Sequence, residues 1–274
     1  MIGLDMPETR ELLEDAVEVI TRLMTSEDPV NFENDRWTLR DARLHLRPYT
    51  HPCFEIAVAA VASPSGPRVA GKYGVGLLSI GATMAAGFDA LALHWDVMEE
   101  RAAKFGQTVD RRTWRLVGPM HVAETREQAE KDVEHGIVDW FRYFQQVAAF
   151  PQMAVEGNER AEMIHFIREG GFGVIGTPDD AVAQIQRLVD QSKGFGSFLL
   201  LAHEWANPEA TRRSYDLIAR YVMPAFQGSA VSTLRARDHA RSVRPALAAK
   251  NQRAVDQMTE KHRIETGAPR NGGH

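Results

Sequence analysis

The chain has 274 residues, of which 44% are hydrophobic and 25% charged, a composition typical of a globular protein with one large or two small domains. Its net charge of −5 argues against a nucleic-acid-binding surface. One cysteine, no signal-peptide pattern and no run of ~20 apolar residues predict a cytoplasmic protein without internal disulfides or membrane spans.

The chain begins with a pattern that predicts a helix followed by a hairpin. Apolar residues recur with helical spacing between residues 7 and 24. Val30 and Phe32, then Trp37 and Leu39, alternate with polar residues on either side of a short polar turn. This alternation is typical of a small β-hairpin.

Residues 54–82 read FEIAVAAVASPSGPRVAGKYGVGLLSIGA and form the most informative segment. An apolar run over 55–61 predicts a buried strand, which stops at SPSGP. A short helix-like segment follows, and a second apolar strand is predicted near 75–80. Together they predict one compact βαβ unit.

The SPSGP turn has the residues of an anion-binding helix start. Ser63 is placed to act as N-cap, Pro64 or Pro67 fits the first helical position, and Gly66 adds no side-chain bulk. The free N–H groups of a helix start, with the positive end of the helix dipole, form a natural phosphate site. An ordinary serine-capped turn that binds no ligand is the alternative.

The remainder of the chain alternates between helices and strands. Thr125 and Gln128 have the spacing of a capping box, and Thr177-Pro178-Asp179-Asp180 is a clear helix start. The pattern predicts strands near 115–122 and 197–202, and helices over 85–105, after 125, near 158–169, over 178–192 and 208–221, and in a polar tail to about 262. We assign residues 1–228 to one domain and 229–274 to a helical tail with a disordered end.

Four short apolar strands separated by amphipathic helices predict a parallel α/β fold. An open doubly wound sheet and a (β/α)8 barrel both fit this order. A complete barrel needs eight strands in ~250 residues, and only four are recognisable. The sequence therefore predicts half a barrel at most.

Two common site patterns are weak here. A literal GxGxxG spans residues 171–176, but a helix end precedes it where the dinucleotide fingerprint requires a strand. We interpret these glycines as a flexible loop leading to the Thr177 cap. His203-Glu204 resembles the start of a zinc motif, but no second histidine has the right spacing, so no metal site is predicted.

Polar residues at the carboxyl ends of the strands are the candidates for chemistry. They are Ser63 and Ser65, residues 79–83, His121, and residues 203–205. His121 fits a hydrogen-bonded core histidine better than a site residue. The cluster at 203–205 fits either a site or, for its glutamate, a helix cap. The aromatic segment 140–153 is more typical of a core or a dimer interface than of a ligand-binding site.

The combined pattern of ARLHLRP, the 56–82 segment and GVIGTPDDAVAQI resembles the luciferase-like flavin-dependent monooxygenases, most closely the limonene-monooxygenase type. The resemblance extends over about residues 1–226. It implies a (β/α)8 barrel that binds FMN at the carboxyl ends of its strands. It also implies that the strands present here correspond to the fifth to eighth of the family, so the barrel is incomplete.

By position, the resemblance assigns the flavin phosphate to Ser63, Ser65 and Gly66, with Pro64 shaping the turn. Arg68 and Lys72 are nearby cations that border this site. The resemblance identifies no catalytic residue, because the family's first four βα units carry much of the substrate pocket and of the flavin-facing surface.

The implied reaction inserts one oxygen atom from dioxygen into a small apolar substrate, using reduced FMN from a separate flavin reductase. We expect the chain to be truncated and inactive alone. The implied partners are a second chain that supplies the missing half-barrel, or further copies in a homo-oligomer. The alternatives are a deazaflavin-dependent oxidoreductase and a non-catalytic fragment or subunit.

Overall fold

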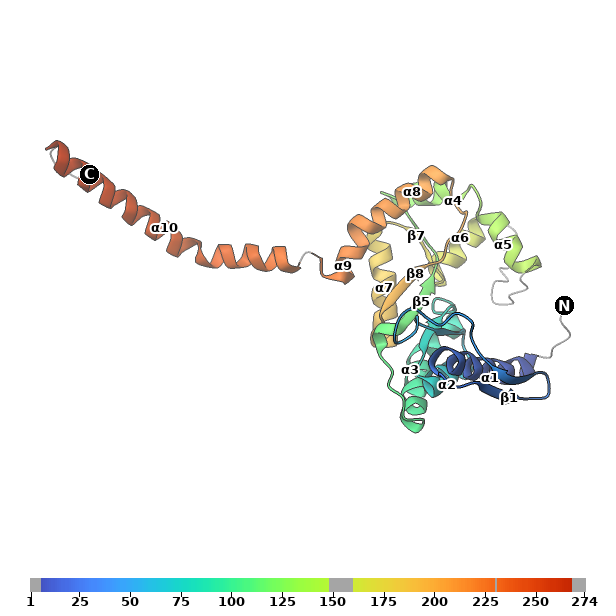
Figure 1. The fold of residues 1–274 in the computed structure, drawn as a ribbon. Helices are drawn as coiled ribbons and strands as arrows, with labels where there is room; N and C mark the ends of the chain where they lie inside the picture. The colour runs from blue at the N-terminus through green and yellow to red at the C-terminus, as the bar shows by residue number, and fades with distance from the viewer. Residues whose placement is uncertain (1–5, 148–159, 230, 268–274) are drawn as a thin grey trace. The chain divides into compact units, whose positions relative to one another are not determined.

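The computed structural model describes residues 6–147, 160–229 and 231–267, and the chain divides into two compact units, Met1–Val222 and Met223–His274. Figure 1 labels the helices and several of the strands. The strands are β1 (Val30–Glu33), β2 (Thr38–Ala42), β3 (Ala57–Ala60), β4 (Gly76–Ser79), β5 (Trp114–Gly118), β6 (Met120–Val122), β7 (Val174–Gly176) and β8 (Ser197–Leu200). The α-helices are α1 (Met6–Thr25), α2 (Ser65–Tyr73), α3 (Ala85–Lys104), α4 (Arg126–Val133), α5 (Ile137–Gln146), α6 (Arg160–Glu169), α7 (Pro178–Ser192), α8 (Pro208–Leu217), α9 (Met223–Gln227) and α10 (Val231–Thr266).

The predicted N-terminal helix and hairpin are confirmed. Strands β1 and β2 pair antiparallel, with Phe32 opposite Leu39. Phe32 and Trp37 stack with their ring centroids 4.9 Å apart, a contact that holds the two strands at their turn.

A parallel sheet in the order β3-β4-β5-β8 forms the centre of the first unit. Figure 1 shows β5 and β8 side by side. The four strands correspond to the four apolar segments of the sequence, so the prediction of a parallel α/β fold is confirmed. All four carboxyl ends therefore lie at one edge of the sheet.

Helices α2 and α3 cover one face of this sheet. Apolar side chains of the two helices pack against alternate residues of the strands, among them Val58, Leu77, Trp114 and Leu116. The two helices approach closely, since a Cβ atom on Gly71 would lie 2.3 Å from the Met98 carbonyl oxygen.

The strand predicted over 115–122 divides at Pro119 into β5 and β6. Strand β5 pairs with β4 and β8, whereas β6 pairs in parallel with β7. Proline cannot donate to a sheet ladder, but the Pro119 carbonyl oxygen accepts from Val174 N–H at 3.1 Å. Strand β7 lies within the GxGxxG segment, so the interpretation of this segment as a flexible loop was wrong for residues 174–176.

The predicted helix start at Thr177 is confirmed as a full capping box with Asp180. Thr125 also caps its helix, accepting from Gln128 N–H at 3.1 Å. The Gln128 side chain, however, donates to Asp132 instead of completing the box. Helix α8 is capped by Asn207, which accepts from Ala210 N–H, so Glu204 is not a cap.

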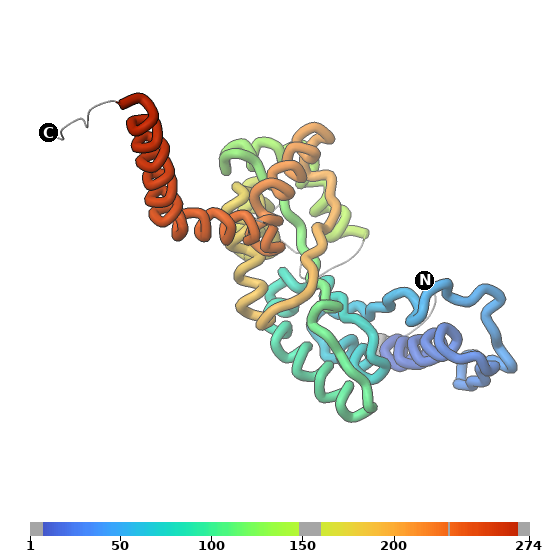
Figure 2. The backbone as a smooth tube through the Cα atoms, turned by 60° about the vertical axis from the view of Figure 1, so that its left-hand side comes forward, coloured from blue at the N-terminus to red at the C-terminus, as the bar shows by residue number. Residues whose placement is uncertain are grey.

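The second unit consists of α9 and α10. Figure 2 shows that α10 changes direction along its length, and Pro245 lies inside the helix, where proline removes one backbone hydrogen bond. Among the described helices of both units, none is long and apolar enough to cross a bilayer.

Candidate functional site

The SPSGP turn lies directly beyond the carboxyl end of β3. The N-cap of α2 is Pro64, and no side chain caps the helix. Ser63 therefore is not the N-cap, and neither proline occupies the first helical position, which belongs to Ser65. Instead, the hydroxyl oxygens of Ser63 and Ser65 lie 2.8 Å apart and share a hydrogen bond. Two hydroxyls thus stand together at the start of the helix.

Gly66 is required by the packing of the turn against β3. A Cβ atom there would lie 2.7 Å from the Ala59 carbonyl oxygen and 2.9 Å from the Ala60 Cβ atom. Any other residue would push the start of α2 away from the strand. Gly66 thus seats the helix start on the sheet edge.

A cavity of about 230 Å³ lies beside the turn, between α1 and α2. Both serines line it, together with the cations Arg10 and Arg68 and the anions Glu11 and Glu14. Lys72, the other predicted border cation, is 2.6 Å from Glu14. The Arg10 and Arg68 side chains make no ion pair with the described residues, and each is solvent-exposed.

A histidine of α3 that sequence reasoning missed contacts the backbone just before the turn. His94 of α3 is fully buried, and its Nε2 atom is 3.2 Å from the carbonyl oxygen of Ala62, the residue before the turn. Burial lowers the pKa of His94, although its contacts with the Ala62 and Ser63 backbone oppose the shift. The Nδ1 atom has no hydrogen-bond partner among the described residues.

An apolar cavity of about 420 Å³ opens at the carboxyl ends of β3 and β4. Val61 and Ala62 line it from the segment after β3, Thr83 and Met84 from the segment after β4, and two phenylalanines from the α6 region, Phe166 and Phe172. A cavity of about 480 Å³ lies at the amino ends of the same strands. Chemistry in parallel α/β folds collects at the carboxyl ends, which favours the first cavity.

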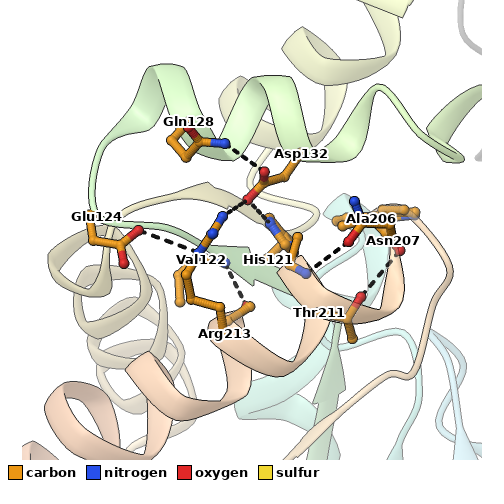
Figure 3. Close-up of polar contacts among 12 residues, drawn as sticks. His121, Val122, Glu124, Gln128, Asp132, Ala206, Asn207, Thr211 and Arg213 are labelled. Carbon is orange, nitrogen blue, oxygen red and sulfur yellow. Dashed lines mark hydrogen bonds and ion pairs between the residues drawn. The ribbon is translucent and has the colours of Figure 1, made fainter.

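A second polar cluster surrounds Asp132 of α4 (Figure 3). Its carboxylate accepts from Gln128 at 2.7 Å and from Arg213 at 2.8 Å, and it lies 3.2 Å from His121 Nε2. Burial opposes ionisation of Asp132, but these hydrogen bonds keep its pKa below the usual value. His121 is 1% exposed, so the expectation of a hydrogen-bonded core histidine is confirmed.

After β8, the half-buried His203 and the buried Trp205 form a further cluster. The His203 Nε2 atom lies 3.1 Å from the Met120 carbonyl oxygen, and its ring stacks on Trp205 at 3.9 Å between centroids. Burial lowers the pKa of His203 to about 4. Trp205 packs edge-on against Trp140 in a core that includes Phe141, which supports the core interpretation of the aromatic segment; its residues beyond 147 lie outside the described part.

The structure therefore separates the predicted candidates into two groups. Ser63 and Ser65 share the turn at the start of α2, whereas His121 lies in the Asp132 cluster and His203 stacks on Trp205. In the described ranges, no group of three or more metal-ligating side chains occurs. The serine turn carries half-buried hydroxyls beside a cavity, and it is the candidate ligand site.

Comparison with known proteins shows the family. The family model described as luciferase-like monooxygenase matches residues 1–192, and the chain belongs to this family. It is 45% identical over 235 residues to limonene 1,2-monooxygenase of Rhodococcus erythropolis, covering 86% of this chain and 59% of the relative. It is 35% identical to 4-hydroxyprotoasukamycin monooxygenase of Streptomyces nodosus subsp. asukaensis, covering 83% of this chain and 62% of the relative.

Solved structures share the fold. Monooxygenase RslO1 from Streptomyces bottropensis matches with a TM-score of 0.63 at 18% identity, over 81% of this chain and 63% of that one. The oxygenating constituent of 3,6-diketocamphane monooxygenase from Pseudomonas putida, solved with FMN, matches with a TM-score of 0.54 at 22% identity, over 78% of this chain and 63% of that one. The chain thus spans about three fifths of the length of these relatives.

Proposed function

We propose that the turn formed by Ser63, Pro64, Ser65 and Gly66 binds the phosphate group of FMN, and that the chain takes part in a flavin-dependent monooxygenase reaction. The observation that carries the proposal is the pair of serine hydroxyls 2.8 Å apart at the start of α2. Family membership and the FMN bound in one fold relative support it.

The donor set at the turn fits a phosphate group. Hydrogen bonds to a charged group contribute about 1.5–3 kcal/mol each, whereas the helix dipole contributes about 0.3–1 kcal/mol. The hydroxyls of Ser63 and Ser65 therefore supply most of the local affinity. Arg10 and Arg68 add positive charge along the same cavity, which the carboxylate of Glu11 partly offsets.

The apolar cavity beyond β3 and β4 would receive a small apolar substrate. Its lining of Met84, Phe166 and Phe172 offers no charged group, so its contribution is to exclude water and orient the substrate. When bound, reduced FMN from a separate reductase would supply two electrons to dioxygen, with one oxygen atom going to the substrate and the other to water.

We propose further that the four-stranded sheet is part of the wall of a (β/α)8 barrel. In the described residues, β3 pairs only with β4, and β8 pairs only with β5. The sheet face opposite α2 and α3 carries partly exposed apolar side chains: Val61 (38% exposed), Ile80 (44%), Leu199 (39%) and Leu201 (37%). Further βα units from another chain would cover this face, and catalysis would depend on them.

The binding site is tested by titrating the chain with FMN and with riboflavin, which lacks the phosphate. We expect the double variant Ser63→Ala/Ser65→Ala to raise the Kd for FMN at least about tenfold, or ~1.4 kcal/mol, and to leave the Kd for riboflavin unchanged. Thr125→Ala, which removes a distant helix cap, is the control. An unchanged FMN-to-riboflavin ratio in the double variant would remove the phosphate assignment.

Gly66→Val is less informative than the serine double variant, because the added side chain would collide with the β3 backbone and alter folding.

A deazaflavin cofactor is distinguished by competition between FMN and the deazaflavin F420 for the unmodified chain. Stronger binding of F420 than of FMN would favour the alternative oxidoreductase.

A further inference from the structure

We infer that His94 is a positioning residue for the anion-binding turn: its imidazole anchors the backbone before Ser63 so that the donors of the turn face a bound phosphate. This inference rests on the proposed function of the turn. Its basis is the 3.2 Å contact between His94 Nε2 and the Ala62 carbonyl oxygen inside a fully buried environment.

The contact fixes the tautomer of the histidine. A carbonyl oxygen only accepts hydrogen bonds, so the proton of the neutral ring must reside on Nε2. The Nδ1 atom then carries a lone pair, and it has no partner among the described residues. Burial of the ring disfavours its charged form and lowers the pKa of His94, against the opposing contacts with the Ala62 and Ser63 backbone, so the ring stays neutral with its proton on Nε2.

The anchored carbonyl also determines where the next N–H points. The peptide between Ala62 and Ser63 is planar, and in a trans peptide the C=O and N–H bonds point in opposite directions. Because His94 holds the Ala62 oxygen toward the core, the Ser63 N–H faces away from the core. It donates to no described residue, which leaves it available to a ligand.

The next peptide has no such donor, because Pro64 lacks an N–H. Ser63 N–H is therefore the last backbone donor before the helix, and the first turn of α2 supplies the following ones. Loss of the His94 anchor would let the Ala62–Ser63 peptide rotate and would misplace this donor together with the Ser63 hydroxyl. In this arrangement the serines contact the phosphate, and His94 fixes the orientation of the Ser63 donors.

The test compares His94→Leu with His94→Gln, in which the side-chain amide can still donate to the Ala62 oxygen. Affinities for FMN and riboflavin are measured for each variant and for the unmodified chain. We expect His94→Leu to weaken FMN binding about tenfold with riboflavin binding unchanged, and His94→Gln to restore most of the loss. His121→Gln, a buried histidine of the Asp132 cluster, should not alter the FMN-to-riboflavin ratio.

Equal losses for FMN and riboflavin in His94→Leu, or no loss, would overturn the positioning role while leaving the serine assignment intact. No preference for FMN in the unmodified chain would overturn both. Should His94→Leu fail to fold, nitrogen NMR of the unmodified chain decides: a neutral Nε2–H ring at pH 7 supports the inference, and an Nδ1–H or charged ring contradicts it.

Discussion

At the scale of single residues, burial dominates the behaviour of the histidines. His94, His121 and His203 all have lowered pKa values, and burial is the largest cause for each. Their neighbours are backbone carbonyls, the Asp132 carboxylate and the Arg213 guanidinium. Neutral imidazoles thus hold hydrogen bonds inside the protein, and none of them is poised to titrate at neutral pH.

His203 makes the stability of the chain depend on pH. The unfolded state binds a proton near pH 6.5 and the folded state only near pH 4, so stability is complete above pH 6.5 and is lost as the pH falls toward 4. The loss is at most about 3 kcal/mol. We expect His203→Gln, measured by urea unfolding across this range, to flatten the profile; an equally steep profile in the variant would contradict the assignment.

The buried polar contacts that sequence reasoning missed have no local signal in the sequence. His94 lies among Leu91, Trp95 and Met98 on the buried face of α3, where its spacing is that of a core residue. The one available clue was that a histidine on such a face needs a buried partner. Asp132 and Arg213 meet across 81 residues of sequence, a contact that no local pattern reveals.

At the scale of elements, the threonine caps of α4 and α7 were predictable because their chemistry is confined to a few residues, whereas the predicted cap at Ser63 was wrong. Asp180 completes the box at Thr177 and also pairs with Arg126 at 2.6 Å. These contacts lower its pKa to about 2, with the Arg126 hydrogen bond the largest cause. The start of α7 is therefore held by an ionised carboxylate.

Asp180→Ala should destabilise the chain by about 2 kcal/mol at pH 7. A carboxylate with a lowered pKa stabilises the fold above its unfolded value near 4 and ceases to do so as the pH falls toward 2. The difference between the variant and the parent in thermal or urea unfolding should shrink over this window. A pH-independent difference would show that the charge has no part in the cap.

Strand β7 could not be predicted, because a three-residue strand that ends in a glycine shows no periodicity and its partner β6 lies some 50 residues earlier. Gly173 is the residue that permits the pairing: a Cβ atom there would lie 2.7 Å from the Pro119 carbonyl oxygen. The hairpin of β1 and β2, in contrast, was visible from alternation alone. Local pairing is readable in a sequence, whereas distant pairing follows from packing.

Gly173→Val should therefore destabilise the fold by more than the ~1 kcal/mol typical of substitutions, since the added side chain would separate β7 from β6. Gly106→Val is the matched control, because a Cβ atom on Gly106 meets nothing within 4 Å, although its positive φ adds its own cost. Thermal unfolding of both variants tests the close approach. A smaller loss for Gly173→Val than for Gly106→Val would contradict it.

At the scale of the whole molecule, the sheet of the first unit has one covered and one exposed apolar face. Exposed apolar surface of this kind favours association. We expect the isolated chain to self-associate and to bind an apolar dye such as ANS. The double variant Ile80→Lys/Leu199→Lys should reduce both effects in light scattering and dye fluorescence. A monomer that binds no dye would contradict the proposed barrel wall.

Amide NMR of the ¹⁵N-labelled chain shows directly whether the turn holding Ser63 and Ser65 binds the phosphate of FMN. We expect FMN to shift the amide signals of Ser63, Ser65 and Gly66, riboflavin to leave them unchanged, and inorganic phosphate to reproduce part of the shift. FMN-induced shifts confined to other residues, with these three signals unmoved, would contradict it.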